Sequence, residues 1–382
     1  MKIKIPSLCA AAILAFAFHP SFLCAQGSLT PPGAPAPTMK SLDQIEPRTP
    51  VDATHTPGTP DQQFTISQPG SYYLTGNITA VSGVVFGILI QANDVTLDLN
   101  GFAMTGLGND DGIVVNVTGV ARNIVIRNGT LRNWAIGVDG SGGYCELDHM
   151  RACACTENGF YLGDHCIVRG CTVVSSGGTG ILGGDNCVVI ECLVSSNATG
   201  MSCGTNCVVS GCEAATNTLD GIDLGDNFNI TKCTSNCNGR TGGSRGAGFN
   251  LGSYGQIRQC MANGNNSDGM DGMSSCTVRE CIANNNVLGG ISMHTLSIIT
   301  DNDATANGSD GIETFGAGSR IDSNHTFNNE SFGIYSNGNA DADIIVRNIS
   351  RDNYVGDYFP TNGTTLGPLL SPATATSPWA NF

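Results

Sequence analysis

A glycine followed by an apolar residue recurs along most of this 382-residue chain at nearly constant intervals. Consecutive members of this glycine column are 20 to 27 residues apart, and most steps are 21 or 22 residues. The twelve members are Gly87, Gly112, Gly137, Gly159, Gly180, Gly200, Gly221, Gly248, Gly269, Gly290, Gly311 and Gly333. A fixed period of this kind predicts one structural unit stacked many times, rather than several separate domains.

Cysteines form a second column about half a repeat away. The phrases "CIVRGC", "CVVIEC", "CVVSGC" and "CTVREC" begin at Cys166, Cys187, Cys207 and Cys276, and Cys233 and Cys260 occupy the same place in coils that lack the first cysteine. The cysteine steps of 21, 20, 21, 27 and 21 residues match those of the glycine column over the same region. Two independent columns with one period strengthen the assignment of a repeat.

The length of the repeat selects the fold class. About 21 residues are too few for two helices and a turn, which need 33 or more, and the Leu and Asn framework of leucine-rich repeats is missing. Alternating apolar residues in "VTLDLNGF" and "GIDLGD" are typical of short strands. We therefore predict an all-β solenoid of about twelve coils, with parallel strands about 4.8 Å apart from coil to coil.

Several phrases resemble a known family. "NIVIRNGTLRNWAIGV" from Asn123 and the corner "NNESFGIYS" from Asn328 are similar to segments of right-handed parallel β-helices of the pectate-lyase-like superfamily. The resemblance covers residues 61–357, and "FTISQPGSYYLTGNIT" from Phe64 resembles the strand that caps the N-terminal end. It implies the fold but no single activity, because this fold carries lyases, hydrolases, epimerases and adhesins.

The chain departs from the catalytic patterns of these families. The Asn-Thr-Asp, Gly-His-Gly and Arg-x-Lys motifs of polygalacturonase-like enzymes are absent, and so is the Asp-Pro-His-Glu of mannuronan epimerases. The resemblance therefore transfers no catalytic residue to this sequence.

Composition excludes some partners. The formal net charge is −15 and only 13% of residues are charged, so the massed Lys and Arg of a nucleic-acid site are missing. No run after the first residues is long and apolar enough to span a bilayer. We expect neither a nucleic-acid partner nor a membrane span, and oligomeric state cannot be inferred.

The two ends differ from the repeats in composition. Lys2 and Lys4 before the apolar segment 8–18 predict a signal peptide at residues 1–25, and hence a secreted or periplasmic protein. Residues 26–60 are rich in proline and predict an extended linker. Residues 358–382 form a tail of low complexity in which Trp379 and Phe382 are candidates to dock onto the solenoid.

Fifteen cysteines lie between Cys145 and Cys281. We expect the cysteine columns to be small apolar residues of the core, since cysteine is commonly buried. Disulfides between neighbouring coils are an alternative, because a spacing of about 4.8 Å is within bonding range. A metal site formed by His149, Cys153 and Cys155 is a further alternative.

Outward positions on the glycine-containing strand are candidates for a binding site. If the apolar residue after each glycine points inward, the next residue points outward, and we call this set the stripe. It comprises Asp139, Tyr161, Leu182, Ser202, Asp223, Asn250, Asp271, Ser292, Glu313 and Tyr335. Asp223 and Asp271 are two coils apart, or about 9.6 Å, which is near the carboxylate separation of inverting glycosidases and also suits Ca²⁺ shared through oxygen ligands.

One long insertion and one histidine lie next to the stripe. The insertion between the coils, at 236–247, carries Arg240 and Arg245, whose guanidinium groups could bind an acidic sugar. His294 is outward on the same strand as Ser292 and is the nearest acid or base candidate. Asp220, Asp268 and Asp310 precede column glycines and are expected to serve Asx turns.

These features lead to two functional hypotheses. The first is a secreted protein that binds or cleaves an extracellular polysaccharide or cell-surface glycan, with Asp223, Asp271 and His294 as catalytic candidates. In this hypothesis Arg240, Arg245, Asn250 and Glu313 contact substrate, Ca²⁺ is the candidate cofactor, and any enzymatic activity would be that of a polysaccharide lyase or glycoside hydrolase, acting on an acidic polysaccharide. The second is a structural or adhesive rod without catalysis, in which the stripe is solvated surface.

Overall fold

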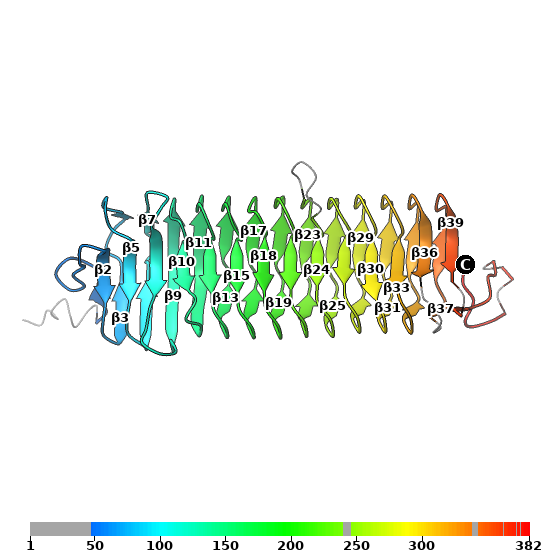
Figure 1. The fold of residues 1–382 in the computed structure, drawn as a ribbon, viewed down its shortest axis with the longest axis horizontal. Coiled ribbons are helices and arrows are strands. Elements are labelled where there is room, and N and C mark those ends of the chain that lie inside the picture. Colours follow the sequence, from blue (N-terminus) through cyan, green and yellow to red (C-terminus); the bar gives the residue numbers. More distant parts are fainter. Residues whose placement is uncertain (1–46, 240–245, 338–342, 362, 372, 375) are drawn as a thin grey trace, which may run out of the picture. The chain divides into compact units, whose positions relative to one another are not determined.

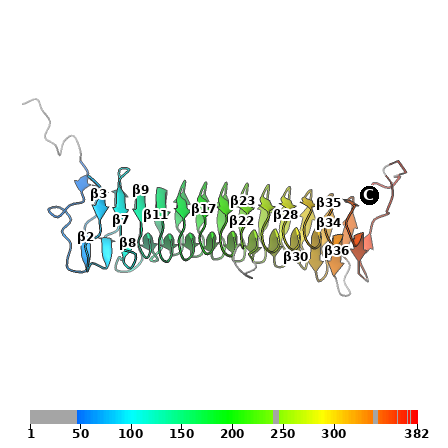
Figure 2. The ribbon, with the colours of Figure 1, turned by 90° about the horizontal axis from the view of Figure 1, so that it is seen from above.

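The computed structural model describes residues 47–382 except 240–245, 338–342, 362, 372 and 375. The chain divides into two units, Met1–Pro47 and Arg48–Phe382. The predicted signal peptide and most of the predicted linker lie outside the described residues. The second unit is a stack of coils, each made of short strands joined by tight corners, as Figures 1 and 2 show.

The described residues form strands and turns without any helix. The solenoid has about 15 turns of about 21 residues each, and the predicted parallel β-helix fold is confirmed. The count of about twelve coils was too low. Strands β2 and β39 carry Gln63 and Asp357 where the other coils have the column glycine, so a count based on glycine misses both ends.

Most coils contribute one strand to each of three faces. Face 1 consists of β2 (Gln62–Ile66), β5 (Phe86–Ile90), β8 (Asp111–Val115), β10 (Val138–Gly140), β12 (Phe160–Leu162), β15 (Ile181–Gly183), β18 (Met201–Cys203), β21 (Ile222–Leu224), β24 (Phe249–Leu251), β27 (Met270–Gly272), β30 (Ile291–His294), β33 (Ile312–Phe315), β36 (Phe332–Asn337) and β39 (Gly356–Pro360).

Face 2 begins with β1, which pairs with β3. It consists of β1 (Thr49–Pro50), β3 (Gly70–Tyr73), β6 (Val95–Asp98), β9 (Ile124–Arg132), β11 (Cys145–Cys153), β13 (Ile167–Arg169), β16 (Val188–Ile190), β19 (Val208–Ser210), β22 (Asn229–Thr231), β25 (Gln256–Arg258), β28 (Thr277–Arg279), β31 (Ile298–Thr300), β34 (Arg320–Asp322), β37 (Ile344–Val346) and β40 (Thr365–Leu366).

Face 3 shares the long strands β9 and β11 with face 2, so that the two faces form one continuous sheet. Its other strands are β4 (Ile78–Thr79), β7 (Ala103–Thr105), β14 (Thr172–Val174), β17 (Leu193–Ser195), β20 (Glu213–Ala215), β23 (Thr234–Asn236), β26 (Met261–Asn263), β29 (Ile282–Asn284), β32 (Asp303–Thr305), β35 (His325–Phe327) and β38 (Ile349–Arg351).

All strand pairs run parallel and in register, so equivalent residues of successive coils lie in columns. Inward columns of Ile, Val, Leu, Met and Ala fill the core. The column glycines are required by the close approach of the next coil. A Cβ atom at Gly200 would lie 2.3 Å from the carbonyl oxygen of Gly221, and one at Gly290 would lie 2.5 Å from that of Gly311.

Three corner columns run along the inside of the solenoid. Column A lies between faces 1 and 2, column B between faces 2 and 3, and column C between faces 3 and 1. At many of these corners a residue with positive φ, such as Glu191 or Asp301, precedes an inward-pointing Cys, Asn or Ser. Column B contains Cys171, Cys192, Cys212, Cys233, Cys260, Cys281, Asn302, Asn324, Asn348 and Asn381.

Many corner residues accept a hydrogen bond from the backbone of the coil before them. The backbone N–H of Cys192 donates to Sγ of Cys212 at 3.4 Å. Further along column B, the N–H of Asn302 donates to Oδ1 of Asn324 at 2.9 Å. The cysteines are therefore core residues, as expected, but they also satisfy buried backbone donors.

All fifteen described cysteines are free thiols, and only Cys153 and Cys237 are not buried. The disulfide alternative therefore does not hold in this structure. No group of three or more Cys, His, Asp or Glu within the described ranges could hold a metal ion. At the suggested metal site, Nδ1 of His149 instead lies 2.7 Å from Oδ1 of Asp148.

Parts of the predicted linker and tail belong to the solenoid. Val51, just after β1, is buried against the first coils. At the other end, Asn381 extends column B by accepting a hydrogen bond from the N–H of Asn348 at 2.9 Å. The guanidinium of Arg347 lies over the ring of Trp379 at 5.4 Å. The last residues thus cover the end of column B. Within the described part of the chain, no helix is long and apolar enough to cross a membrane.

Candidate functional site

The stripe is one continuous column of face 1, in which the side chain of Ser292 is buried. The strand register pairs Asp223 with Asn250, Asn250 with Asp271, and Asp271 with Ser292. It then continues through Glu313 to Tyr335. The sequence therefore predicted the alignment of these side chains correctly, while their functional roles stay predictions.

Asp223 is held in place by its neighbours in the stripe. Its Oδ2 accepts a hydrogen bond from Ser202 at 3.1 Å, and its Oδ1 accepts one from the amide of Asn250 at 3.1 Å. Burial raises the pKa of this carboxyl above its ordinary value, and the two hydrogen bonds partly offset that rise. Asp223 is thus an oriented hydrogen-bond acceptor on the surface of face 1.

Asp271 and Glu313 lie in a more negative environment. Burial raises the pKa of Asp271, with Asp268 adding to the rise. Burial, followed by the charges of Asp310 and Asp268, raises the pKa of Glu313 to about 7. Glu313 is consequently close to half protonated near neutral pH.

Three aspartates at the edge of face 1 link successive coils. Oδ1 of Asp220 accepts the N–H of Ala247 at 2.7 Å, and Oδ1 of Asp310 accepts that of Phe332 at 2.8 Å. Asp268 makes the same contact with the N–H of Gly289 at 2.7 Å. These bonds join one coil to the next, whereas an Asx turn would be local, so the predicted role in Asx turns was wrong.

His294 lies at the end of β30, two residues beyond Ser292, and is partly exposed. Its ring is 5.5 Å from that of Phe315 on the next coil. A positive charge on His294 lowers the pKa of Asp271, against the larger effect of burial. The structure therefore brings His294 near Asp271, and the acid–base role stays a prediction.

The predicted substrate residues Arg240 and Arg245 lie outside the described residues. The described ends of their insertion are anchored beside face 1, where the N–H of Gly239 donates to the carbonyl of Asn217 at 2.9 Å. On the other side of the insertion, Ala247 is bonded to Asp220. The insertion thus leaves the solenoid next to the acidic edge of the stripe.

An aromatic cluster at the C-terminal end of face 1 was missed. Tyr335 continues the stripe, and its ring lies 5.7 Å from Phe332 and 5.2 Å from Phe359. The rings of Phe332 and Phe359 are 4.9 Å apart. Phe359 follows Tyr335 in the register, so extending the column by one coil past residue 357 would have found it.

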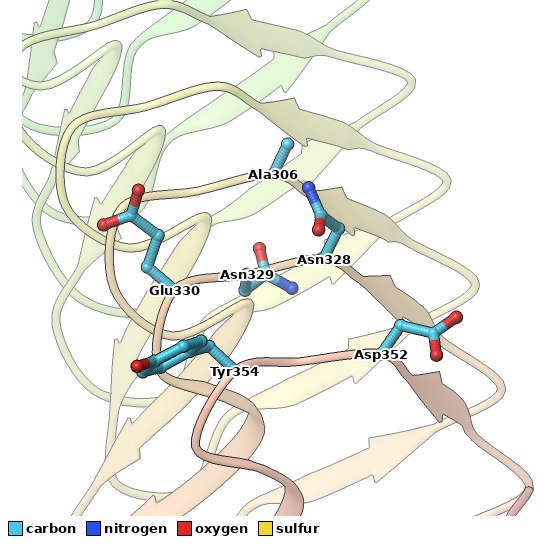
Figure 3. Close-up of a pocket in the computed structure, with 6 residues that line it drawn as sticks. All are labelled: Ala306, Asn328, Asn329, Glu330, Asp352 and Tyr354. Atoms are coloured by element: carbon cyan, nitrogen blue, oxygen red, sulfur yellow. The ribbon is translucent and has the colours of Figure 1, made fainter.

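A cavity of about 450 Å³ lies at the corner that leads into the same two coils, as shown in Figure 3. Glu330 and Tyr354 line one side of it, and Asn328 and Asp352 line the other. Glu330 comes two residues before β36, and Tyr354 comes two residues before β39. The cavity therefore adjoins the strands that carry the aromatic cluster.

Comparisons with known proteins show the fold alone. No protein-family model matches the chain, and no curated protein matches it in sequence. Among solved structures, the A-module of Azotobacter vinelandii mannuronan C-5 epimerase AlgE4 is similar, with a TM-score of 0.55 and 14% identity over 78% of this chain and 91% of that one. The A-module of the AlgE6 epimerase from the same organism matches with a TM-score of 0.50 and 12% identity over 78% and 89% of the two chains. The chain is thus a right-handed parallel β-helix similar in fold to these modules.

Proposed function

We propose that this protein binds a polysaccharide along face 1, with the stripe from Asp223 to Glu313 as the contact surface. The observation that carries the proposal is the register of outward carboxylate and amide groups at Asp223, Asn250, Asp271 and Glu313, which the buried Ser292 interrupts. Sugar hydroxyls are donors and acceptors that repeat along a chain, as these groups do. The similar epimerase modules are named for mannuronan, a polysaccharide, which supports the ligand class.

In this proposal Asp223 and Asn250 act as an oriented pair, since the amide already holds one carboxylate oxygen. Arg240 and Arg245 contact the ligand from the insertion that leaves the solenoid near Asp220. The proposal places the protein outside the cytoplasm, in keeping with residues 1–25 as a signal peptide. The rival hypothesis, a structural rod, predicts no glycan binding at this face.

Affinity electrophoresis in gels that contain single polysaccharides tests the proposal. We expect retardation of the wild type by at least one polysaccharide, and loss of that retardation in the double variant Asp223→Ala/Asp271→Ala. Asp139→Ala is the matched control, because Asp139 occupies the same stripe four coils before Asp223. Equal retardation of the double variant and the wild type would exclude the stripe as the contact surface.

Cleavage of the bound chain is a second candidate function, favoured by the protonation of Glu313. A carboxyl with a pKa of about 7 is suited to donate a proton to a leaving oxygen. In the hydrolase version Glu313 is the acid and Asp271 the general base. In the lyase version His294 removes a proton from the sugar. Cations beside Asp223 and Asp271 stabilise the negative charge that then develops on the sugar.

We propose that this cation is Ca²⁺. Oxygen ligands suit Ca²⁺, but the described residues contain no trio of acidic, His or Cys ligands. The ion would therefore be shared between stripe carboxylates, such as Asp271 and Glu313, and the ligand itself. Addition of a chelator should abolish binding or cleavage if Ca²⁺ takes part, and should have no effect otherwise.

Two assays separate the chemistries. Reducing ends without new ultraviolet absorbance indicate hydrolysis, and absorbance from an unsaturated product indicates a lyase. Loss of reducing-end release in Glu313→Gln with binding retained supports the hydrolase, and loss of absorbance in His294→Ala supports the lyase. Full activity in both variants would remove both residues from the reaction.

A further inference from the structure

The last two coils of face 1 bring three aromatic rings together, those of Phe332, Tyr335 and Phe359. Phe359 is 42% exposed, and Tyr354, which lines the cavity, is 88% exposed. Phe332 and Tyr335 stack with an angle of 14° between their rings. Exposed rings have a cost in water, so their concentration at one place indicates a surface that is covered in use.

The same coils also present hydrogen-bonding groups. Glu330 and Asp352 bring carboxylates to the cavity, and Asn328 brings an amide. Glu313 precedes Tyr335 in the stripe. Flat rings flanked by carboxylate and amide groups match a sugar ring, which has an apolar C–H face and hydroxyls at its edge.

The charge of the surroundings restricts the kind of sugar. Glu313, Glu330 and Asp352 are acidic, and Asp310 and Asp268 add negative charge that acts on Glu313. The nearby guanidinium of Arg351 lies over the ring of Phe327, 5.4 Å from its centre, and Phe327 ends a strand of face 3. A uronate carboxylate placed among these groups would meet like charges.

We infer that the cavity lined by Glu330 and Tyr354, together with the rings of Phe332, Tyr335 and Phe359, is a subsite for uncharged sugar units. This inference rests on the proposed function and names its substrate class. It differs from the acidic polysaccharide that the sequence suggested. The cavity, of about 450 Å³, is within the usual range for small-ligand sites, and the rings continue the stripe beyond Glu313 in the same direction.

Binding of defined oligosaccharides to the full chain tests the inference. The probes are hexamers of β-1,4-linked glucose, mannose and xylose, and hexamers of galacturonate and mannuronate, measured by calorimetry at low salt. We expect an uncharged hexamer to bind and the uronates not to bind. Tyr335→Ala and Tyr354→Ala should each weaken binding about tenfold, the size of a lost stacking contact.

Tyr161→Ala is the matched control. Tyr161 occupies the same stripe at β12 and is 38% exposed, but it lies eight coils before Tyr335. The Tyr161→Ala variant should bind the uncharged hexamer as the wild type does. Tyr354 is so exposed that its replacement should not disturb folding, which circular dichroism can verify.

The outcomes separate this inference from the proposed function. If Tyr335→Ala and Tyr354→Ala bind an uncharged hexamer as well as Tyr161→Ala does, the subsite is wrong while the stripe remains the contact surface. If only the uronates bind, the substrate class is wrong. If no probe binds, or if the aromatic variants instead abolish self-association in sedimentation experiments, the inference fails, and in the absence of any glycan binding the proposed function fails with it.

Discussion

Column B is built from two different side chains in two regions of the solenoid. From Cys171 to Cys281 its residues are thiols, and from Asn302 to Asn381 they are amides. The corner is the same in both regions, with a positive φ at the preceding residue, as at Glu191 and Asp301. The comparison therefore isolates the side chain from the backbone.

The amide connects more groups than the thiol does. Oδ1 of Asn324 accepts hydrogen bonds from both the N–H and the Nδ2 of Asn302, and its own Nδ2 donates to Ile299 and Asn348. Sγ of Cys212 accepts one long bond, of 3.4 Å, from the N–H of Cys192, and donates weakly to the carbonyls of Val189 and Ser210 at 3.6 and 3.4 Å. The corner needs only an acceptor that fits, and the amides also tie three coils together.

The largest predicted difference is in the cost of removing one column B residue. Asn324→Ala leaves several buried polar groups without partners and should lower the free energy of unfolding by about 3 kcal/mol. Cys212→Ala removes a small side chain and a weak acceptor and should cost about 1–2 kcal/mol. Denaturant unfolding followed by circular dichroism measures both. An equal or larger loss of unfolding free energy in Cys212→Ala would contradict a greater contribution of the amides to stability.

Exchanging the side chains should depend on position. An Asn at 281 can donate to Oδ1 of Asn302, its neighbour in the amide region, so Cys281→Asn should be neutral or stabilising by up to about 1 kcal/mol. An Asn at 212 would face Cys233, a poor acceptor, and Cys212→Asn should cost about 1–2 kcal/mol. The same unfolding experiment compares the two variants. If both variants lower the free energy of unfolding equally, the boundary between the thiol and amide regions of column B has no effect on stability.

Carboxylates on face 1 should also respond differently in the two regions. The pKa of Glu313 is raised to about 7, so the folded protein loses stability as pH rises from about 4.5 to about 7, where the unfolded chain has already released this proton. Glu313→Gln should therefore raise the melting temperature at pH 8 and change it little at pH 5, an effect on the order of 1–2 kcal/mol.

Asp223→Asn provides the contrast for Glu313→Gln. The hydrogen bonds from Ser202 and Asn250 offset part of the rise in the pKa of Asp223 that burial causes, so Asp223→Asn should raise the melting temperature at pH 8 by less than Glu313→Gln does. A melting temperature of Glu313→Gln that is unchanged at pH 8 would show that the acidic surroundings of Glu313 are screened by solvent.

The smallest predicted effect concerns thiol chemistry. Cys237 is exposed, unlike the thiols of column B, and should react with a thiol reagent in the folded protein. Cys237→Ser should remove one fast-reacting thiol and change the free energy of unfolding by less than about 0.5 kcal/mol. Fast reaction of further thiols in Cys237→Ser would indicate that the corner columns open in the native state.

Much of the fold followed from columns that can be read along the sequence. The glycine column marks the places where a Cβ atom would collide with the next coil, as at Gly200, and it sets the register that aligns Asp223 with Asp271. The two end coils escaped this reading, because Gln63 and Asp357 stand in place of the column glycine there.

The properties of the site were less predictable because they depend on neighbours in other columns. The pKa of Glu313 is set by burial and by Asp310 and Asp268, which lie at the edge of the face rather than in the stripe. The role of Asp310 was missed for a similar reason, since its partner Phe332 is on the next coil. Single-column reading identifies what is aligned, but not what is close across columns.

The strict register of face 1 places the side chains of the stripe at regular intervals along the solenoid. Each coil advances an outward side chain by one strand spacing, about 4.8 Å, so the separation of Glu313 from any other stripe residue is a whole number of such steps. Inserting or deleting one coil between two stripe residues would change their separation by one strand spacing without altering the surroundings of either residue. The number of coils would then determine the preferred length of the ligand. Variants that differ by one coil should differ in the shortest oligomer that they bind.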